Sequence, residues 1–134
     1  MTEESTNENI TVNLDIIREA YSTFFAFISR FVGQKKAEEF SHLSYRLTCR
    51  YFSSLETLRL NEENVLTSEY QHLKDRDILG FSLWMYNFVS ELKNFMIGVG
   101  DIDVSEILGP LKPTLEEAGF FEYFQQAEEL KYFE

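Results

Sequence analysis

The apolar residues between positions 77 and 100 recur at alternating steps of three and four, which is the spacing of one face of a helix. The residues that follow this rhythm are Ile78, Phe81, Met85, Phe88, Leu92, Phe95 and Val99. Such a face packs either on other helices or in a lipid bilayer. In a bilayer Glu91 and Lys93 would lie inside the span, where each costs about 2.5 to 3.5 kcal/mol near the centre. We therefore predict a core helix of a helical bundle, with Phe88 and Leu92 buried, and no insertion into a membrane.

Two earlier segments repeat this spacing. The first helix is expected to begin after Asn13, a favourable N-cap, and to end at Gly33. Its apolar face consists of Leu14, Ile17, Tyr21, Phe24, Ile28 and Phe31. The second helix is expected from about residue 34 to residue 55. Its buried face is predicted to consist of Ala37, Phe40, Leu43, Ser44, Leu47 and Tyr51.

The remaining segments complete the expected fold. Residues 56–66 have no helical pattern and read as a connection, whereas residues 67–76 can form a further helical turn. After residue 100, a capped helix start at Asp103 is followed by breaks at Pro110 and Gly119. The sequence thus predicts an all-α, antiparallel helical bundle of about four main helices with a broken C-terminal helical segment.

Composition limits the domain organisation and the partners. We expect residues 1–12, which are polar and acidic, to be a disordered lead-in to one helical-bundle domain over residues 13–134. The formal net charge of −11 repels phosphate backbones, so we expect no nucleic-acid partner. Since the single Cys49 cannot form an internal disulfide and the N-terminal stretch is not an apolar signal, we expect a cytoplasmic protein.

Two Glu-x-x-His motifs raise the question of a di-metal site. They are Glu39 with His42 and Glu69 with His72. Carboxylate-bridged di-iron bundles use two such pairs on facing helices, because residues three apart share a helix face. Here both pairs fall off the apolar stripes of their segments and are expected to face solvent. We predict no metal and no cofactor, and a di-metal carboxylate enzyme is only a remote alternative.

A cationic stripe runs along the second predicted helix. Glu38, His42, Arg46 and Arg50 are four residues apart, so they line one face. They lie in the stretch 34–59, where five Lys and Arg against three Glu leave a local net charge of +2. One interpretation is a solvated face with weak ion pairs. The other is a docking surface for an acidic partner or an anionic ligand, formed by His42, Arg46 and Arg50.

The C-terminal segment is the candidate partner interface. It contains Phe120, Phe121, Tyr123, Phe124 and Tyr132, interleaved with glutamates. These residues cover more of a helix than one buried face needs, and aromatic anchors inside a charged rim are typical of interaction sites. Either the segment docks a partner, or it packs back on its own chain.

Two smaller alternatives concern Cys49 and the aromatic rings. Arginines close to Cys49 in sequence can lower the pKa of its thiol, but a structural cysteine is the other reading. The rings of the first and third helices, Phe24 among them, can either fill the core or leave a cavity for an apolar small molecule. We expect a non-catalytic protein-interaction or regulatory module that can self-associate through its C-terminal segment, with a sensor of an apolar small molecule as the alternative.

The expectation that both Glu-x-x-His pairs face solvent can be tested by measuring the metal content of the purified protein. Protein purified without chelator should contain no stoichiometric iron, manganese or zinc in elemental analysis, because the four side chains point away from the core. Near-stoichiometric iron that disappears in a His42→Ala, His72→Ala double variant would contradict this expectation and favour a di-metal enzyme.

Overall fold

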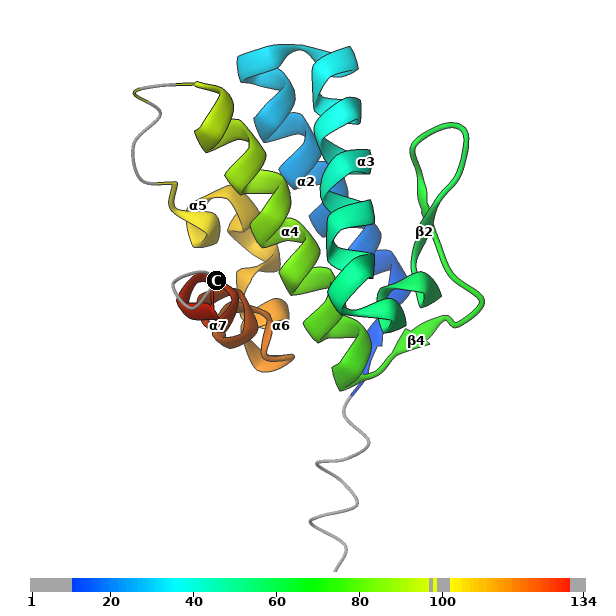
Figure 1. Ribbon diagram of the computed structural model, residues 1–134. Coiled ribbons are helices and arrows are strands. Elements are labelled where there is room, and N and C mark those ends of the chain that lie inside the picture. The colour runs from blue at the N-terminus through cyan, green and yellow to red at the C-terminus, as the bar shows by residue number, and fades with distance from the viewer. Residues whose placement is uncertain (1–10, 97, 99–101, 131–134) are drawn as a thin grey trace, which may run out of the picture.

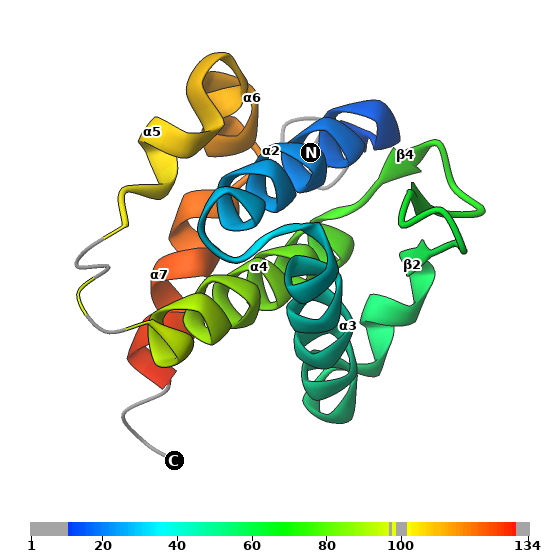
Figure 2. The same ribbon diagram turned by 90° about the horizontal axis from the view of Figure 1, so that it is seen from above.

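A computed structural model describes residues 11–96, 98 and 102–130 of the chain. It is mostly helical, with helices packed against one another and two very small sheets, which confirms the predicted all-α bundle. The longest helices are α2 (Leu14–Val32), α3 (Gln34–Tyr51) and α4 (Asp75–Phe95). Helix α4 lies between α3 on one side and α7 (Phe120–Leu130) on the other (Figures 1 and 2).

The core is built around the aromatic residues of α2 and α4. Phe24, Phe88 and Leu92 have no exposed surface, which confirms their predicted burial. Trp84 is also fully buried, and its ring stacks on Tyr21 with centroids 5.1 Å apart. The alternating spacing of three and four therefore identified the buried face of α4, because α4 packs chiefly against α3 and α7, with a smaller contact to α2.

Both ends of α2 are fixed by local chemistry that the sequence predicted. The side chain of Asn13 accepts a hydrogen bond of 2.8 Å from the amide of Asp15, as an N-cap does. At the other end Gly33 has a φ of 86°, a left-handed conformation that a side chain would strain. This glycine turns the chain directly into α3 (Figure 1).

The predicted apolar faces are wrong at their ends and along α3. Phe31, Tyr51 and Phe95 are exposed, because each lies at or near the C-terminal end of its helix, beyond the core. Leu43 is exposed as well, and the buried face of α3 contains Ser41 and Thr48 besides the predicted Ala37, Phe40 and Ser44. Val99 lies outside the described residues.

The connection between α3 and α4 contains structure that the helical patterns did not predict. Helix α3 ends at Tyr51 and a 3-10 turn, η1 (Ser53–Thr57), follows. Strands β2 (Arg59–Leu60) and β3 (Leu66–Thr67) then pair as an antiparallel hairpin. Figure 1 shows this hairpin standing beside α3.

The expected helical turn over residues 67–76 is replaced by β3, a loop and strand β4 (His72–Leu73). Strand β4 pairs with β1 (Val12–Asn13), and both Val12 and Leu73 are buried. The last residues of the expected lead-in thus join the fold. Residues 1–10 lie outside the described residues.

The C-terminal third is broken into short pieces, as predicted. Helix α5 (Val104–Leu108) begins at Asp103, whose carboxylate accepts from two amide groups of the first turn. A 3-10 turn, η2 (Gly109–Leu111), and helix α6 (Lys112–Glu117) follow before α7. Among the helices that the structure describes, none is long and apolar enough to cross a membrane.

The burial of Phe88 leads to a stability prediction. Truncation of this ring by Phe88→Ala should lower the free energy of unfolding by about 3 to 5 kcal/mol in denaturant melts, because it leaves a cavity in a packed core. The matched control is Phe95→Ala on the same helix, where the ring is 56% exposed and the expected loss is about 1 kcal/mol or less. Equal losses in the two variants would contradict the described register of α4.

Candidate functional site

Small polar side chains decide which face of α3 is buried. The Ser41 and Tyr21 hydroxyls lie 2.7 Å apart, and the Trp84 indole donates to the Ser41 carbonyl at 3.2 Å. The Thr48 hydroxyl accepts from the side-chain amide of Asn87 at 2.9 Å. Burial raises the pKa of Tyr21 to about 12, partly offset by its hydrogen bonds. These contacts join α3 to α2 and α4 through its serine and threonine face, so that its cationic stripe lies on the far side.

The three residues of the predicted docking stripe line one surface hollow of about 600 Å³. His42, Arg46 and Arg50 come from α3, and the opposite wall comes from η1 and β2. We call this space the cationic hollow. Its lining consists of His42, Tyr45, Arg46, Cys49, Arg50, Glu56, Arg59 and Leu60.

The charge of the cationic hollow is opposite to that of the whole protein. Arg46, Arg50 and Arg59 face one carboxylate, Glu56, which leaves a local charge of +2 when His42 is neutral. Among the described residues these arginines form no ion pair with a carboxylate; the ion pairs found there join Arg18 to Asp15 and Lys36 to Glu39. Three guanidinium groups that no carboxylate neutralises in the described part of the chain can therefore contact an anionic ligand, with Arg59 doing so through its terminal nitrogens because its Nε donates to the Glu56 carbonyl.

The wall opposite α3 is held by contacts with the start of α4. The Thr57 hydroxyl donates to the Asp77 carboxylate at 2.8 Å, and the other oxygen of Asp77 accepts from the amide of Lys74. Gly80 allows the ring of Phe52 to approach α4, since a Cβ there would lie 3.1 Å from a ring carbon. These contacts place Glu56 and Arg59 opposite the arginines of α3.

Tyr45 and Cys49 form the less polar part of the hollow. The Tyr45 hydroxyl donates to the carbonyl of Leu58, which ties α3 to the segment after η1, and burial raises the pKa of this hydroxyl. Burial also raises the pKa of the Cys49 thiol, a hydrogen bond with Tyr45 lowers it in part, and Glu56 raises it. Of the two readings of Cys49, these contacts favour the structural cysteine over an activated thiol, because the residue is half-buried and its pKa is raised.

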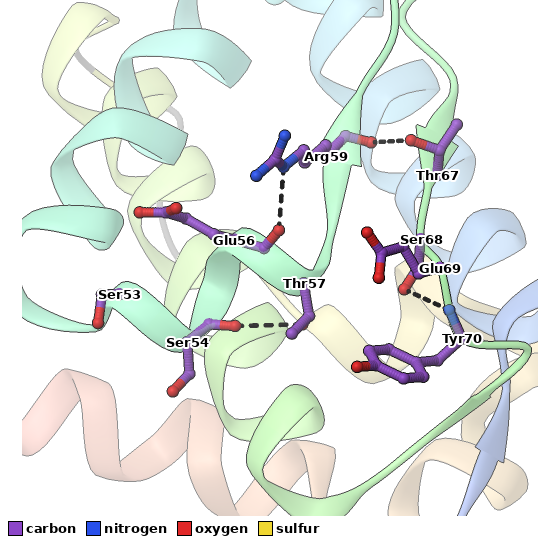
Figure 3. A pocket seen from close by; sticks show the side chains of 9 residues that line it. All are labelled: Ser53, Ser54, Glu56, Thr57, Arg59, Thr67, Ser68, Glu69 and Tyr70. Atoms are coloured by element: carbon purple, nitrogen blue, oxygen red, sulfur yellow. Dashed lines mark hydrogen bonds between the residues drawn. The ribbon is translucent and has the colours of Figure 1, made fainter.

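A second hollow of about 520 Å³ adjoins the first and shares Glu56 and Arg59 with it. Its lining consists of Ser53, Ser54, Glu56, Thr57, Arg59, Thr67, Ser68, Glu69 and Tyr70. Figure 3 shows the Arg59 guanidinium above Glu56 and on the side away from Tyr70. The Nε of Arg59 donates to the backbone carbonyl of Glu56 at 3.2 Å. With two carboxylates and one arginine, this second space is less suited to an anion than the cationic hollow.

The two Glu-x-x-His motifs are not on equivalent elements. Glu39 lies on α3 and forms an ion pair of 2.9 Å with Lys36, which lowers the pKa of its carboxyl. Glu69 lies in a loop and His72 in β4, so these two do not share a helix face. In the part of the chain that the structure describes, no three His, Cys, Asp or Glu side chains are grouped as metal ligands.

The candidate interface residues of the C-terminal segment lie mostly against the core. Phe120 is fully buried and its ring contacts Phe24 and Phe81, so it is not available to a partner. Phe121, Tyr123 and Phe124 are partly buried and pack on the same core. The Tyr123 hydroxyl donates to Asp75, and burial raises the pKa of Tyr123 to about 12. Tyr132 lies outside the described residues.

Sequence reasoning found half of the cationic hollow. The spacing of four identified the α3 side, but the helical patterns did not indicate that Arg59 lies opposite it. The short polar residues Ser53 and Ser54 between Arg50 and Arg59 were a weak signal for a turn that would bring the two arginines to one place.

Comparisons of this chain with protein-family models, with curated proteins and with solved structures give no match.

The raised pKa of Cys49 predicts slow alkylation. At about pH 8 iodoacetamide should modify Cys49 several-fold more slowly than an unstructured cysteine peptide, because less of the thiol is ionised, and the rate should keep rising above the ordinary cysteine pKa of about 8.5. Mass spectrometry follows the modification, with the urea-unfolded protein as the control. Faster modification of the folded protein would contradict the described burial.

Proposed function

We propose that this protein is a non-catalytic interaction module that binds an acidic segment of a partner protein in the cationic hollow. The observation that supports this most is the set of three arginines without carboxylate partners among the described residues, Arg46, Arg50 and Arg59, around one space. In a chain of net charge −11, most cations could be neutralised internally. A place where several are left free is suited to recognition of an anion.

A short acidic protein segment suits this surface better than a nucleic acid. The arginines of the hollow cover a small area, and screening confines their attraction to about 8 Å at physiological salt. An extended phosphate backbone would continue past the hollow onto a surface rich in glutamate and aspartate, which repels it. A peptide can place its few carboxylates at the arginines and a side chain against Tyr45 and Leu60.

Two finer parts of the proposal concern assembly and location. Glu122, Glu128 and Glu129 are exposed on α7, so a second copy of the chain is one source of an acidic segment. We keep homodimer formation as a subsidiary possibility, with Phe121, Tyr123, Phe124 and Tyr132 as its proposed contacts. The single free cysteine suits a reducing compartment, and we propose the cytoplasm.

The alternative of a small-molecule sensor has weaker support. An apolar ligand between the helices would lie where rings already contact one another, such as Phe24, Phe81 and Phe120. These rings fill the space between α2, α4 and α7 in the described structure. For this reason the interaction module is preferred.

The proposal is tested by charge reversal in the cationic hollow. The probe is a soluble peptide of about 16 residues made of alternating Glu and Ser or Gly, titrated into labelled protein and followed by amide chemical shifts at about 50 mM salt. We expect shifts in residues 42–60 of the wild type. An Arg46→Glu, Arg50→Glu, Arg59→Glu variant should bind at least about tenfold more weakly, since three charge-assisted contacts are lost.

The matched control changes the net charge by the same amount as the arginine variant, but at positions outside the cationic hollow. Lys74→Glu, Lys93→Glu, Lys112→Glu reverses three exposed cations outside the hollow and should change the affinity less than about twofold. Equal losses in both variants would mean that the peptide responds only to net charge. That result, or the absence of any shift in the wild type, would disprove the proposed function.

A further inference from the structure

Helix α3 carries an apolar stripe on its outer surface. Leu43 is 47% exposed and Tyr51 is 61% exposed, while Leu47 between them is partly exposed. These three residues are four apart, so they form one line along the helix. The sequence pattern assigned them to the core, but Ser41 and Thr48 are buried in their place.

The apolar stripe is flanked by arginines on one side and by the rest of the protein on the other. At 100° per residue, Arg46 and Arg50 lie next to the stripe toward the cationic hollow, and Ser44 and Thr48 lie next to it toward α4. Leu47 lies between these two flanks. A ligand on the stripe would therefore meet guanidinium groups along a single edge.

We infer that the partner segment is an acidic amphipathic helix that lies along α3, with its apolar face on Leu43, Leu47 and Tyr51 and its carboxylates at Arg46 and Arg50. The inference rests on the proposed function and specifies the partner's chemistry. Charge complementarity supports it, because these arginines have no carboxylate partner among the described residues. A row of apolar anchors beside a charged edge is the surface that amphipathic helices recognise.

The geometry of the stripe favours a helix as the partner. Leu43 and Tyr51 are eight residues apart, which corresponds to about 12 Å along the helix axis. A partner helix that repeats apolar residues at steps of three and four matches this line with two or three side chains. Its flanking glutamates would recur at the same pitch as Arg46 and Arg50, so both contacts can form along the same length.

A second copy of the chain is a less suitable occupant. In a twofold antiparallel pairing of α3 with itself, each flank meets the same flank of the other copy. Arg46 and Arg50 would then face the arginines of the partner copy, which is repulsive. Over residues 120–129 of α7 the exposed side chains are polar, such as Gln125 and Glu128, and would leave the apolar stripe uncovered.

The experiment compares three helical peptides of about 18 residues, each held helical by a side-chain staple. The first has leucines on one face and glutamates on both flanks. The second has lysine in place of each glutamate, and the third keeps the glutamates but has glutamine in place of each leucine. Binding is followed by fluorescence anisotropy at about 150 mM salt, and amide chemical shifts locate it.

We expect the first peptide to bind at least about tenfold more tightly than the other two and to shift α3 resonances. A Leu43→Ser, Leu47→Ser variant should keep the circular dichroism spectrum of the wild type but bind the first peptide about tenfold more weakly. In an Arg46→Glu, Arg50→Glu variant, binding of the first peptide should be lost. The same variant should bind the lysine peptide more tightly than the wild type does, and a disturbed fold would not produce this gain in affinity.

Other outcomes overturn the inference in distinguishable ways. If the first and third peptides bind equally, the cationic hollow binds acid but the apolar stripe is not used, so the inference fails while the proposed function stands. If the acidic and basic peptides bind equally, or if none binds at about 1 mM, no charge-selective helix docks there. If sedimentation shows that the wild type dimerises and the Leu43→Ser, Leu47→Ser variant does not, a second copy covers the stripe instead.

Discussion

The hydrogen-bonded contact of α3 with α2 and α4 determines the surface of this protein. Ser41 meets Tyr21, and Thr48 meets Asn87, at distances of 2.7 and 2.9 Å. Because these side chains are small, α3 can lie close to the aromatic core while its buried polar groups stay paired. An unpaired hydroxyl there would cost about 1 to 3 kcal/mol, so the orientation of α3 about its own axis is strongly specified. Everything on its outer face follows from that orientation.

The connection after α3 converts one charged helix face into a hollow. Asp77 holds Thr57, and Gly80 gives room to Phe52, so that η1 and the hairpin stand beside α3 instead of extending away from it. The hydroxyl of Tyr45 adds a direct link from α3 to the same wall. A surface stripe of arginines would be an ordinary solvated face, whereas a stripe with a facing wall can enclose part of a ligand.

Electrostatics and apolar exposure coincide on one helix. The acids of the chain are spread over most of its surface, yet the outer side of α3 combines arginines that have no carboxylate partner among the described residues with the exposed Leu43 and Tyr51. Either feature alone is common on a monomeric protein. On α3 the two features lie side by side, with the arginines along one edge of the apolar stripe. The proposed partner therefore needs carboxylates that meet the arginines and apolar side chains that contact the stripe.

The sequence by itself determined the helical class, the caps of α2 and α5, the buried face of α4 and the α3 side of the cationic hollow. Those features depend on residues close together in the chain, where spacing and capping chemistry act directly. Only the tertiary structure decided that Thr48 is buried while Leu43 is exposed, that Arg59 lies opposite Arg50, and that Phe120 belongs to the core. Each of these depends on contacts between distant segments, such as Asn87 with Thr48, and no local periodicity carries that information.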